Sequence, residues 1–163
     1  MSKIRIAVIA LDCLLIVLTL VFIFGNSVQN VESSTNISRD VTGVVEKIPP
    51  VKEAIEKGVI EKDSLEGTLR SLAHVAEFAV LGAEIMLLFL LLGIGSFKFT
   101  VLAPIILCLL IGFTDEGIQL LNDRSSQISD VIKDFAGSLC GILFILLIYG
   151  IIKLTKAKKQ SES

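Results

Sequence analysis

Long apolar runs alternate with polar segments along the chain, and there are four such runs. They cover about residues 5–24, 70–95, 98–121 and 129–152. A helix rises about 1.5 Å per residue, so each run is long enough to cross a hydrocarbon core of about 30 Å. The pattern predicts an all-α integral membrane protein with four transmembrane helices. A signal peptide is the rival interpretation of the first run, but no small-residue cleavage site follows it.

Residues 25–69 form the one long hydrophilic section. Its apolar residues fall on one face of a predicted helix: Ile37, Val41, Val44, Val45 and Ile48. Pro49 and Pro50 are expected to stop this helix, and a second short helix is expected from Val51 to Lys57, ended by Gly58. Amphipathic helices of this kind lie at the membrane interface or cover the protein. We therefore expect an extracellular amphipathic helical loop between the first and second spans, with a solvated linker as the alternative.

Basic residues gather on one side of the predicted bundle. Lys3 and Arg5 precede the first span, Lys98 lies between the second and third, and lysines follow the fourth. With four spans, all of these positions share a side, and the positive-inside rule assigns that side to the cytoplasm. We therefore expect the protein in the cell membrane, with both termini cytoplasmic and the 25–69 loop outside.

The amino-acid composition also indicates a membrane protein and argues against other classes of protein. The 163 residues are 53% hydrophobic, too apolar for a soluble domain of this size, and we expect a single domain over 1–163. The net charge is −2 and no basic stripe exists outside the C-terminal tail, which argues against a nucleic-acid partner. Cys13, Cys108 and Cys140 sit inside apolar runs without zinc-ligand spacing, so we interpret them as buried small hydrophobes.

Ionisable residues at three predicted helix ends are the strongest functional signal. Arg70, His74 and Glu77 follow one stripe of the second span. The polar residues that end the third span, link it to the fourth and begin the fourth are Asp115, Glu116, Gln119, Arg124, Asp130 and Asp134. Each ionisable group at membrane depth costs roughly 2.5–3.5 kcal/mol unless it is paired or hydrated. We therefore expect these side chains to converge in one outward-facing polar pocket.

Other small and polar residues inside the spans predict how the helices pack. Gly137 and Gly141 form a Gly-x-x-x-Gly pair, which lets a neighbouring helix approach closely. Asp12 is expected to face another helix rather than lipid. Glu84, about two turns from Glu77, is expected to be protonated or paired with Asp12.

The candidate roles divide by chemistry. Arg70 and Arg124 would hold an anionic head group in their planar guanidinium forks. His74 with Glu77 would act as acid and base, because only histidine titrates near neutrality unperturbed. The candidate catalytic residues are His74, Glu77, Asp115, Glu116 and Asp130, and the candidate substrate-binding residues are Arg70, Gln119, Arg124 and Asp134.

Two alternatives to that division stay open. The arginines could pair with Glu77, Asp115 or Asp130 in a purely structural network. The acids could instead hold a divalent cation, since carboxylate oxygens suit Mg²⁺ or Ca²⁺. Because no ligand motif supports a cation, we assign no metal.

Two stretches of the chain carry a family resemblance. RSLAHVAEFAVLG and TDEGIQLLNDRSSQISDVIKDFAGSLCG resemble the VanZ-like family of small membrane proteins, and FGNSVQNVESSTNISRDVTGVVEKI resembles that family's loop after the first span. Two positions depart from the family pattern: Ile118 stands where a histidine is common, and Asn122-Asp123 replaces a Pro-Gly. His74 is therefore the only imidazole. The resemblance implies an association with low-level resistance to teicoplanin, a glycopeptide antibiotic.

These observations lead to one functional hypothesis and one alternative. The hypothesis is a polar pocket that binds or modifies an anionic amphiphile of the cell envelope, either a membrane lipid or a lipid-linked envelope precursor. The alternative is a non-catalytic lipid transporter or structural membrane scaffold. The sequence does not decide whether the protein is an enzyme, and it identifies no cofactor, substrate or oligomeric state.

Overall fold

Helices make up almost all of the described chain. The structure, a computed structural model, describes residues 2–28, 39–122 and 128–161. Its labelled helices are α1 (Lys3–Val28), α3 (Pro49–Glu56), α4 (Lys62–Leu92), α5 (Phe97–Leu121) and α6 (Ile128–Ser161), and residues 39–45 form a further short helix. The described residues contain no strand. α1, α4, α5 and α6 are long and apolar enough to cross a membrane, which confirms the prediction of an all-α protein with four such helices.

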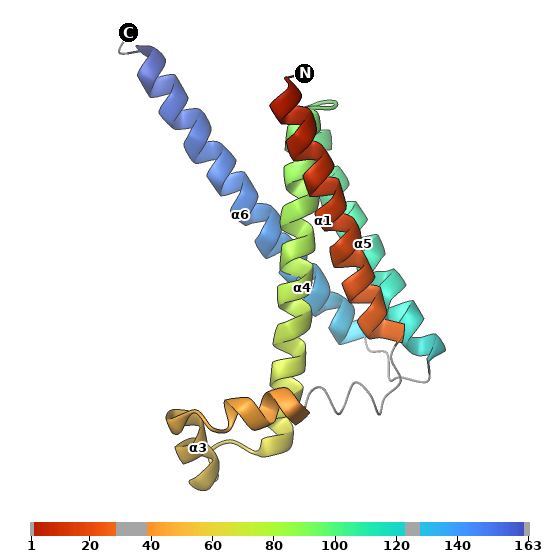
Figure 1. Cartoon of the computed structure of the whole chain (residues 1–163), viewed down its shortest axis with the longest axis vertical. Coiled ribbons are helices and arrows are strands. Elements are labelled where there is room, and N and C mark those ends of the chain that lie inside the picture. The colour runs from red at the N-terminus through yellow and green to blue at the C-terminus, as the bar shows by residue number, and fades with distance from the viewer. Residues whose placement is uncertain (1, 29–38, 123–127, 162–163) are drawn as a thin grey trace.

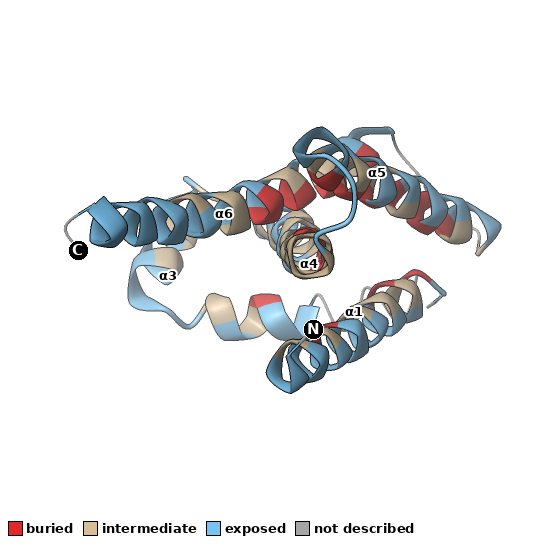
Figure 2. Cartoon of the chain, turned by 90° about the horizontal axis from the view of Figure 1, so that it is seen from above, coloured by how far each residue is buried: buried red, intermediate tan, exposed pale blue. Residues whose placement is uncertain are grey.

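α4 is the central helix of the bundle. It contacts α1, α5 and α6, and α1 and α6 lie on opposite sides of it (Figure 2). Both termini lie at the end of the bundle where α4 turns into α5, while α3 and the start of α6 lie toward the other end (Figure 1). The basic segments at Lys3, Arg5, Lys98 and the C-terminal lysines therefore share one end, as the charge pattern predicts.

The helices differ from the predicted apolar runs mainly at their ends. α1 continues to Val28, past residue 24, and α6 continues to Ser161, past residue 152. The extension of α6 is rich in lysine, which is a good helix former. α4 begins at Lys62, after Glu61, which makes no side-chain cap bond, and so starts eight residues before the predicted span at about residue 70.

From residue 39 on, the segment between α1 and α4 is mostly helical, and three apolar residues of its predicted face are not buried. Val41, Val44 and Ile48 are exposed, at 48%, 66% and 47%. Pro49 and Pro50 open α3 rather than only closing the preceding helix, because proline at a first helical position loses an N–H that would have no helical partner. Gly58 follows α3 with a φ of +69°. Ile37, which belongs to the same predicted face, lies outside the described residues.

Small residues bring α4 and α6 into direct backbone contact. A Cβ placed on Gly141 would lie 1.9 Å from the carbonyl oxygen of Ala79, and one on Gly137 would lie 2.3 Å from that of Val75. These distances confirm that the glycine pair permits a close helix approach. Gly82 of α4 is the reciprocal element, since its Cβ would lie 2.3 Å from the Ser138 carbonyl oxygen.

The apolar core lies where α4 meets its three neighbours. Phe78, Leu81 and Met86 of α4 are fully buried, and Ile23, Cys108 and Ile142 contribute from α1, α5 and α6. Buried residues gather on the faces that these helices turn toward one another (Figure 2). Cys108 is buried as expected, whereas Cys13 and Cys140 are exposed, which corrects their interpretation as buried residues.

Polar contacts hold α1 against α4 toward the end of the bundle where α1 begins and α4 ends. Asp12 is 3% exposed, which confirms that it does not face lipid. The Arg5 guanidinium donates through Nε to the Leu91 carbonyl oxygen at 2.8 Å, and Nη2 donates to the same oxygen. Leu91 belongs to the last turn of α4, where carbonyl groups have no helical donor, so Arg5 satisfies one of them.

Candidate functional site

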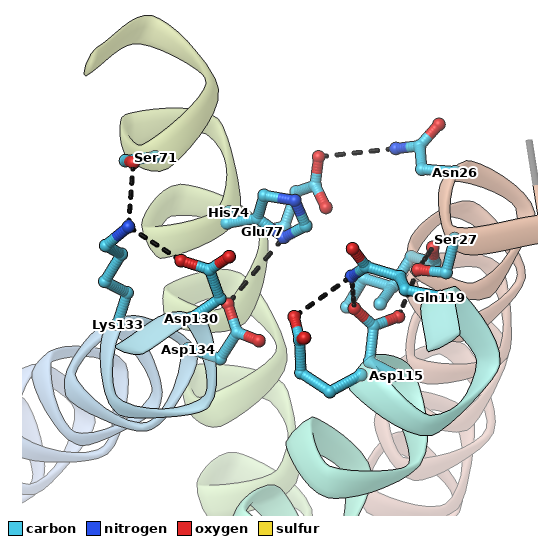
Figure 3. A network of polar contacts seen from close by, with 12 residues as sticks. Asn26, Ser27, Ser71, His74, Glu77, Asp115, Gln119, Asp130, Lys133 and Asp134 are labelled. Atoms are coloured by element: carbon cyan, nitrogen blue, oxygen red, sulfur yellow. Dashed lines mark hydrogen bonds and ion pairs between the residues drawn. The ribbon is translucent and has the colours of Figure 1, made fainter. Parts of the chain in front are cut away.

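A cluster of polar side chains from four helices lies at the end of the bundle away from the termini (Figure 3). We call it the polar cluster; its members are Asn26, Ser27, His74, Glu77, Asp115, Glu116, Gln119 and Asp134. Asp115 and Asp134 are 0% exposed, and Glu116 and Gln119 are 4% exposed. Burying polar groups is costly unless each has a partner, so the contacts inside the cluster determine what it can do.

Within α5, one amide serves two carboxylates. Gln119 Nε2 donates to Asp115 Oδ2 at 2.8 Å and to Glu116 Oε1 at 3.2 Å. The spacings of four and three residues place all three side chains on one helical face. The amide therefore fixes the orientation of both acids.

α1 joins the cluster through two residues that the sequence prediction omitted. The Ser27 hydroxyl has two acceptors, the Asp115 carboxylate and the Ile23 carbonyl oxygen, the latter at 3.1 Å. Asn26 Nδ2 donates to Glu77 Oε1 at 3.4 Å. The available signal was modest: both residues directly follow the apolar run, and one more helical turn brings them to the level of the acids.

His74 and Asp134 connect α4 to α6. His74 Nδ1 lies 3.7 Å from Asp134 Oδ1, which is an ion-pair distance but longer than a hydrogen bond. Neither carboxylate oxygen of Asp134 accepts a hydrogen bond from any residue in 2–28, 39–122 or 128–161. His74, Asp115 and Asp134 each offer one ligand atom, and these atoms all lie within 4.8 Å of one another. The cluster thus contains a potential metal-binding set.

The remaining predicted residues lie around the cluster rather than inside it. Asp130 accepts from Lys133 Nζ at 2.7 Å, and the same amine donates to Ser71 Oγ at 3.1 Å. Arg70 Nη2 lies 4.0 Å from Glu66 Oε1, one turn earlier on α4. A lysine of the same helix therefore pairs with Asp130. Arg124 lies outside the described residues.

Glu84 occupies a separate place farther along α4. Thr19 Oγ1 of α1 donates to Glu84 Oε1 at 3.1 Å. The predicted partner of Glu84 was Asp12, so the threonine is a partner that the sequence prediction did not include.

An open apolar groove runs between α1 and α4, beside the polar cluster. Its volume is about 440 Å³, and its lining residues are Leu18, Thr19, Phe22, Ala76, Glu77 and Val80. Four of the six are apolar. Glu77 therefore belongs both to the groove and to the polar cluster.

Comparison with known proteins places the chain in a family. The VanZ/LLP1 family model matches residues 12–149, which include the whole polar cluster and most of the four long helices. No curated protein and no solved structure matches the chain. The match covers most of the chain and agrees with the resemblance of the RSLAHVAEFAVLG and TDEGIQLLNDRSSQISDVIKDFAGSLCG stretches. The chain belongs to the VanZ/LLP1 family and is a VanZ-like membrane protein.

Proposed function

We propose that this protein binds or modifies an anionic amphiphile of the cell envelope, either a membrane lipid or a lipid-linked envelope precursor. Membership of the VanZ/LLP1 family suggests a link with glycopeptide resistance, and we propose that this activity contributes to resistance to teicoplanin. One observation carries the proposal: Glu77 lines the apolar groove and also accepts a hydrogen bond within the polar cluster. An amphiphile needs a polar site and an apolar surface joined in this way.

The two parts of such a ligand fit different parts of the molecule. An acyl or prenyl chain would lie along Leu18, Phe22 and Val80, where apolar side chains form the walls of the groove. The head group would lie beside Glu77 and His74, which are three residues apart and so share a face of α4. Arg70 is half-exposed near this end of α4 and would approach the head group from the membrane surface.

Acid–base chemistry at the site would belong to His74 and Glu77. Histidine is suited to proton transfer near neutral pH, and a carboxylate one turn away can orient it or exchange the proton. Asp115, Glu116 and Asp134 would position the reacting group, with Gln119 holding the first two in place. Asp130 would take part from beside the cluster, and Arg124, which lies outside the described residues, would bind the head group.

A non-catalytic transporter or scaffold is the second candidate. It is favoured by the hydrogen bond from Ser27 to Asp115, which joins α1 to α5 as a structural contact would. His74→Gln separates the two functions because glutamine keeps polarity but cannot take up a proton. Loss of resistance at wild-type abundance supports acid–base chemistry, whereas retained resistance supports the second candidate.

We place the polar cluster at the outer face of the membrane, with both termini in the cytoplasm. The basic ends at Arg5 and Lys98 support this orientation. With Cys13 and Cys140 replaced by serine, an impermeant thiol reagent applied to intact cells should label a cysteine at Gly43 and not one at Lys98. Labelling at Lys98 alone would reverse the orientation.

The acids of α5 provide the direct test of the site. Asp115→Asn and Glu116→Gln keep the shape of each side chain but remove its charge, so they should abolish teicoplanin resistance while the protein still reaches the membrane. Membrane abundance and teicoplanin susceptibility are measured together. Lys57→Ala is the control, because Lys57 is an exposed residue of the 25–69 segment. Full resistance of both acid variants at wild-type abundance would contradict a functional role of the cluster.

A further inference from the structure

The polar cluster contains an unusual donor set at its centre. His74 of α4, Asp115 of α5 and Asp134 of α6 come from three helices, and their ligand atoms lie within 4.8 Å of one another. Ligands around an ion at about 2.0–2.2 Å lie roughly 3–4 Å apart, so small side-chain movements would bring all three to one ion. The His74–Asp134 distance of 3.7 Å already meets that spacing.

The buried carboxylate of Asp134 is a second observation that points to a bound cation. It is 0% exposed, and both carboxylate oxygens lack a hydrogen bond from any described residue. A buried charged group without such bonds is strongly destabilising, and a bound cation is one way in which proteins stabilise it. Its carboxylate points toward His74 and the α5 acids (Figure 3), so an ion bound there would also reach Asp115.

We propose that His74, Asp115 and Asp134 bind a divalent transition-metal ion, Zn²⁺ or Mn²⁺. One imidazole with two carboxylates suits these ions, whereas Mg²⁺ and Ca²⁺ sites in proteins are built from oxygen ligands. Three protein ligands leave at least one coordination position for water or a substrate oxygen, as in catalytic zinc sites.

The surrounding contacts match what a metal site requires beyond its ligands. Asp115 keeps one oxygen on Ser27 and the other on Gln119, and such outer contacts orient a ligating carboxylate. Ser138 Oγ donates to the backbone oxygen of Asp134 at 3.0 Å in the same turn of α6. Among the described residues, such contacts orient the Asp115 carboxylate, whereas the Ser138 bond goes to the backbone of Asp134 and not to its carboxylate.

A metal ion would also resolve an electrostatic conflict in the proposed function. A buried group of carboxylates repels an anionic head group, whereas an ion bound between Asp115 and Asp134 would attract it. This consequence rests on the proposed function, but metal binding itself does not.

The experiment measures metal binding by the full-length protein in detergent, with no lipid substrate added. The protein, free of any histidine tag and carrying Cys13→Ser and Cys140→Ser, is stripped with a chelator. Zn²⁺, Mn²⁺ or Mg²⁺ is then added alone. Bound metal is counted by mass spectrometry after desalting, and the melting temperature is recorded with and without each ion.

We expect one equivalent of Zn²⁺ or Mn²⁺ per chain, a higher melting temperature with that ion, and no comparable effect of Mg²⁺. Asp134→Asn and His74→Gln should each weaken binding at least tenfold. Glu84→Gln is the matched control, since Glu84 is an acid of α4, the helix that carries His74, but is not one of the three proposed ligands. This variant should bind the metal ion as the wild type does.

Wild-type protein that retains neither Zn²⁺ nor Mn²⁺ would overturn the proposal even if every variant misfolded. Equal binding by wild type and folded Asp134→Asn would also overturn it. Loss of resistance in the α5 acid variants together with absence of metal would leave the proposed function standing and remove only the metal.

Discussion

The two sides of α4 are packed in opposite ways. Toward α6, backbone meets backbone, and a Cβ on Gly137 or Gly141 would overlap a carbonyl oxygen of α4. Toward α1, a groove of about 440 Å³ stays open, and Leu18 and Phe22 in its lining are more than half exposed. α4 is thus packed closely against α6 and less closely against α1.

This difference assigns different tasks to the two interfaces. The close contact with α6 fixes Asp134 relative to His74, and a site that binds a ligand precisely needs such fixed geometry. The looser contact with α1 leaves apolar surface that a lipid chain can cover. Glu77 lines the groove and accepts a hydrogen bond within the polar cluster, so a ligand of the proposed kind would reach the cluster from the groove.

The largest effect is expected from breaking the close interface. Gly141→Leu places a side chain where 1.9 Å separates a Cβ from the Ala79 carbonyl oxygen. Overpacking against side chains costs about 1–3 kcal/mol, and backbone yields less, so we expect a loss of at least about 3 kcal/mol in the free energy of unfolding. Thermal unfolding in detergent measures this loss.

The control for that experiment is on the same helix. Gly150→Leu adds the same side chain at a position where a Cβ meets no atom within 4 Å, and it should melt as the wild type does. If Gly141→Leu and Gly150→Leu have equal melting temperatures, the backbone contact does not exist in the folded protein.

A smaller effect is expected where α1 meets the polar cluster. Ser27→Ala removes a buried donor to the Asp115 carboxylate, and loss of such a bond to a charged group costs about 1.5–3 kcal/mol. The exposed Thr155 makes only a local bond, to Ile152, so Thr155→Ala should be neutral. Unfolding of the two variants is compared in the same detergent. Equal stability of Ser27→Ala and wild type would show that the Ser27–Asp115 hydrogen bond does not stabilise the cluster.

The smallest effect on stability is expected from a substitution in the groove, which should nevertheless clearly reduce the amount of bound lipid. Ala76→Phe fills the groove from the α4 side and should change the free energy of unfolding by less than about 0.5 kcal/mol. The lipid that stays bound through purification, counted by native mass spectrometry, should fall severalfold. Ala73→Phe is the control, because Ala73 is exposed and does not line the groove. Undiminished lipid in Ala76→Phe would show that the groove holds none.

The helices could be predicted from the sequence because hydropathy alone determines which segments can cross a membrane. Gly137 and Gly141 were predictable for a similar reason, since their spacing places both on one helical face. Gly82 carried an equal signal as a glycine inside an apolar helix, but its partner Ser138 depends on the register between α4 and α6. Register is a property of packing, and no local pattern shows it.

The site was less predictable than the helices. The ion pair of Asp130 with Lys133 follows from their spacing of three residues, and that of Arg70 with Glu66 from a spacing of four. Both ion pairs could have been predicted from the sequence, but pairs between residues farther apart in the chain were considered instead. Ser27 gave only a modest signal, its place just after the apolar run, because nothing local shows that α1 continues one turn beyond that run.

The length of α6 affects how the protein sits in the membrane. Its 34 residues, at about 1.5 Å each, make a helix about 51 Å long, well beyond a hydrocarbon core of about 30 Å. When its apolar part fills that core, the lysines of its last turns reach the level of the lipid phosphates: Lys153, Lys156, Lys158 and Lys159. Each contributes about 1 kcal/mol at an anionic surface. The end of α6 thus anchors the bundle at a depth set by lipid charge, and bilayer thickness then determines how far the polar cluster lies below the opposite surface.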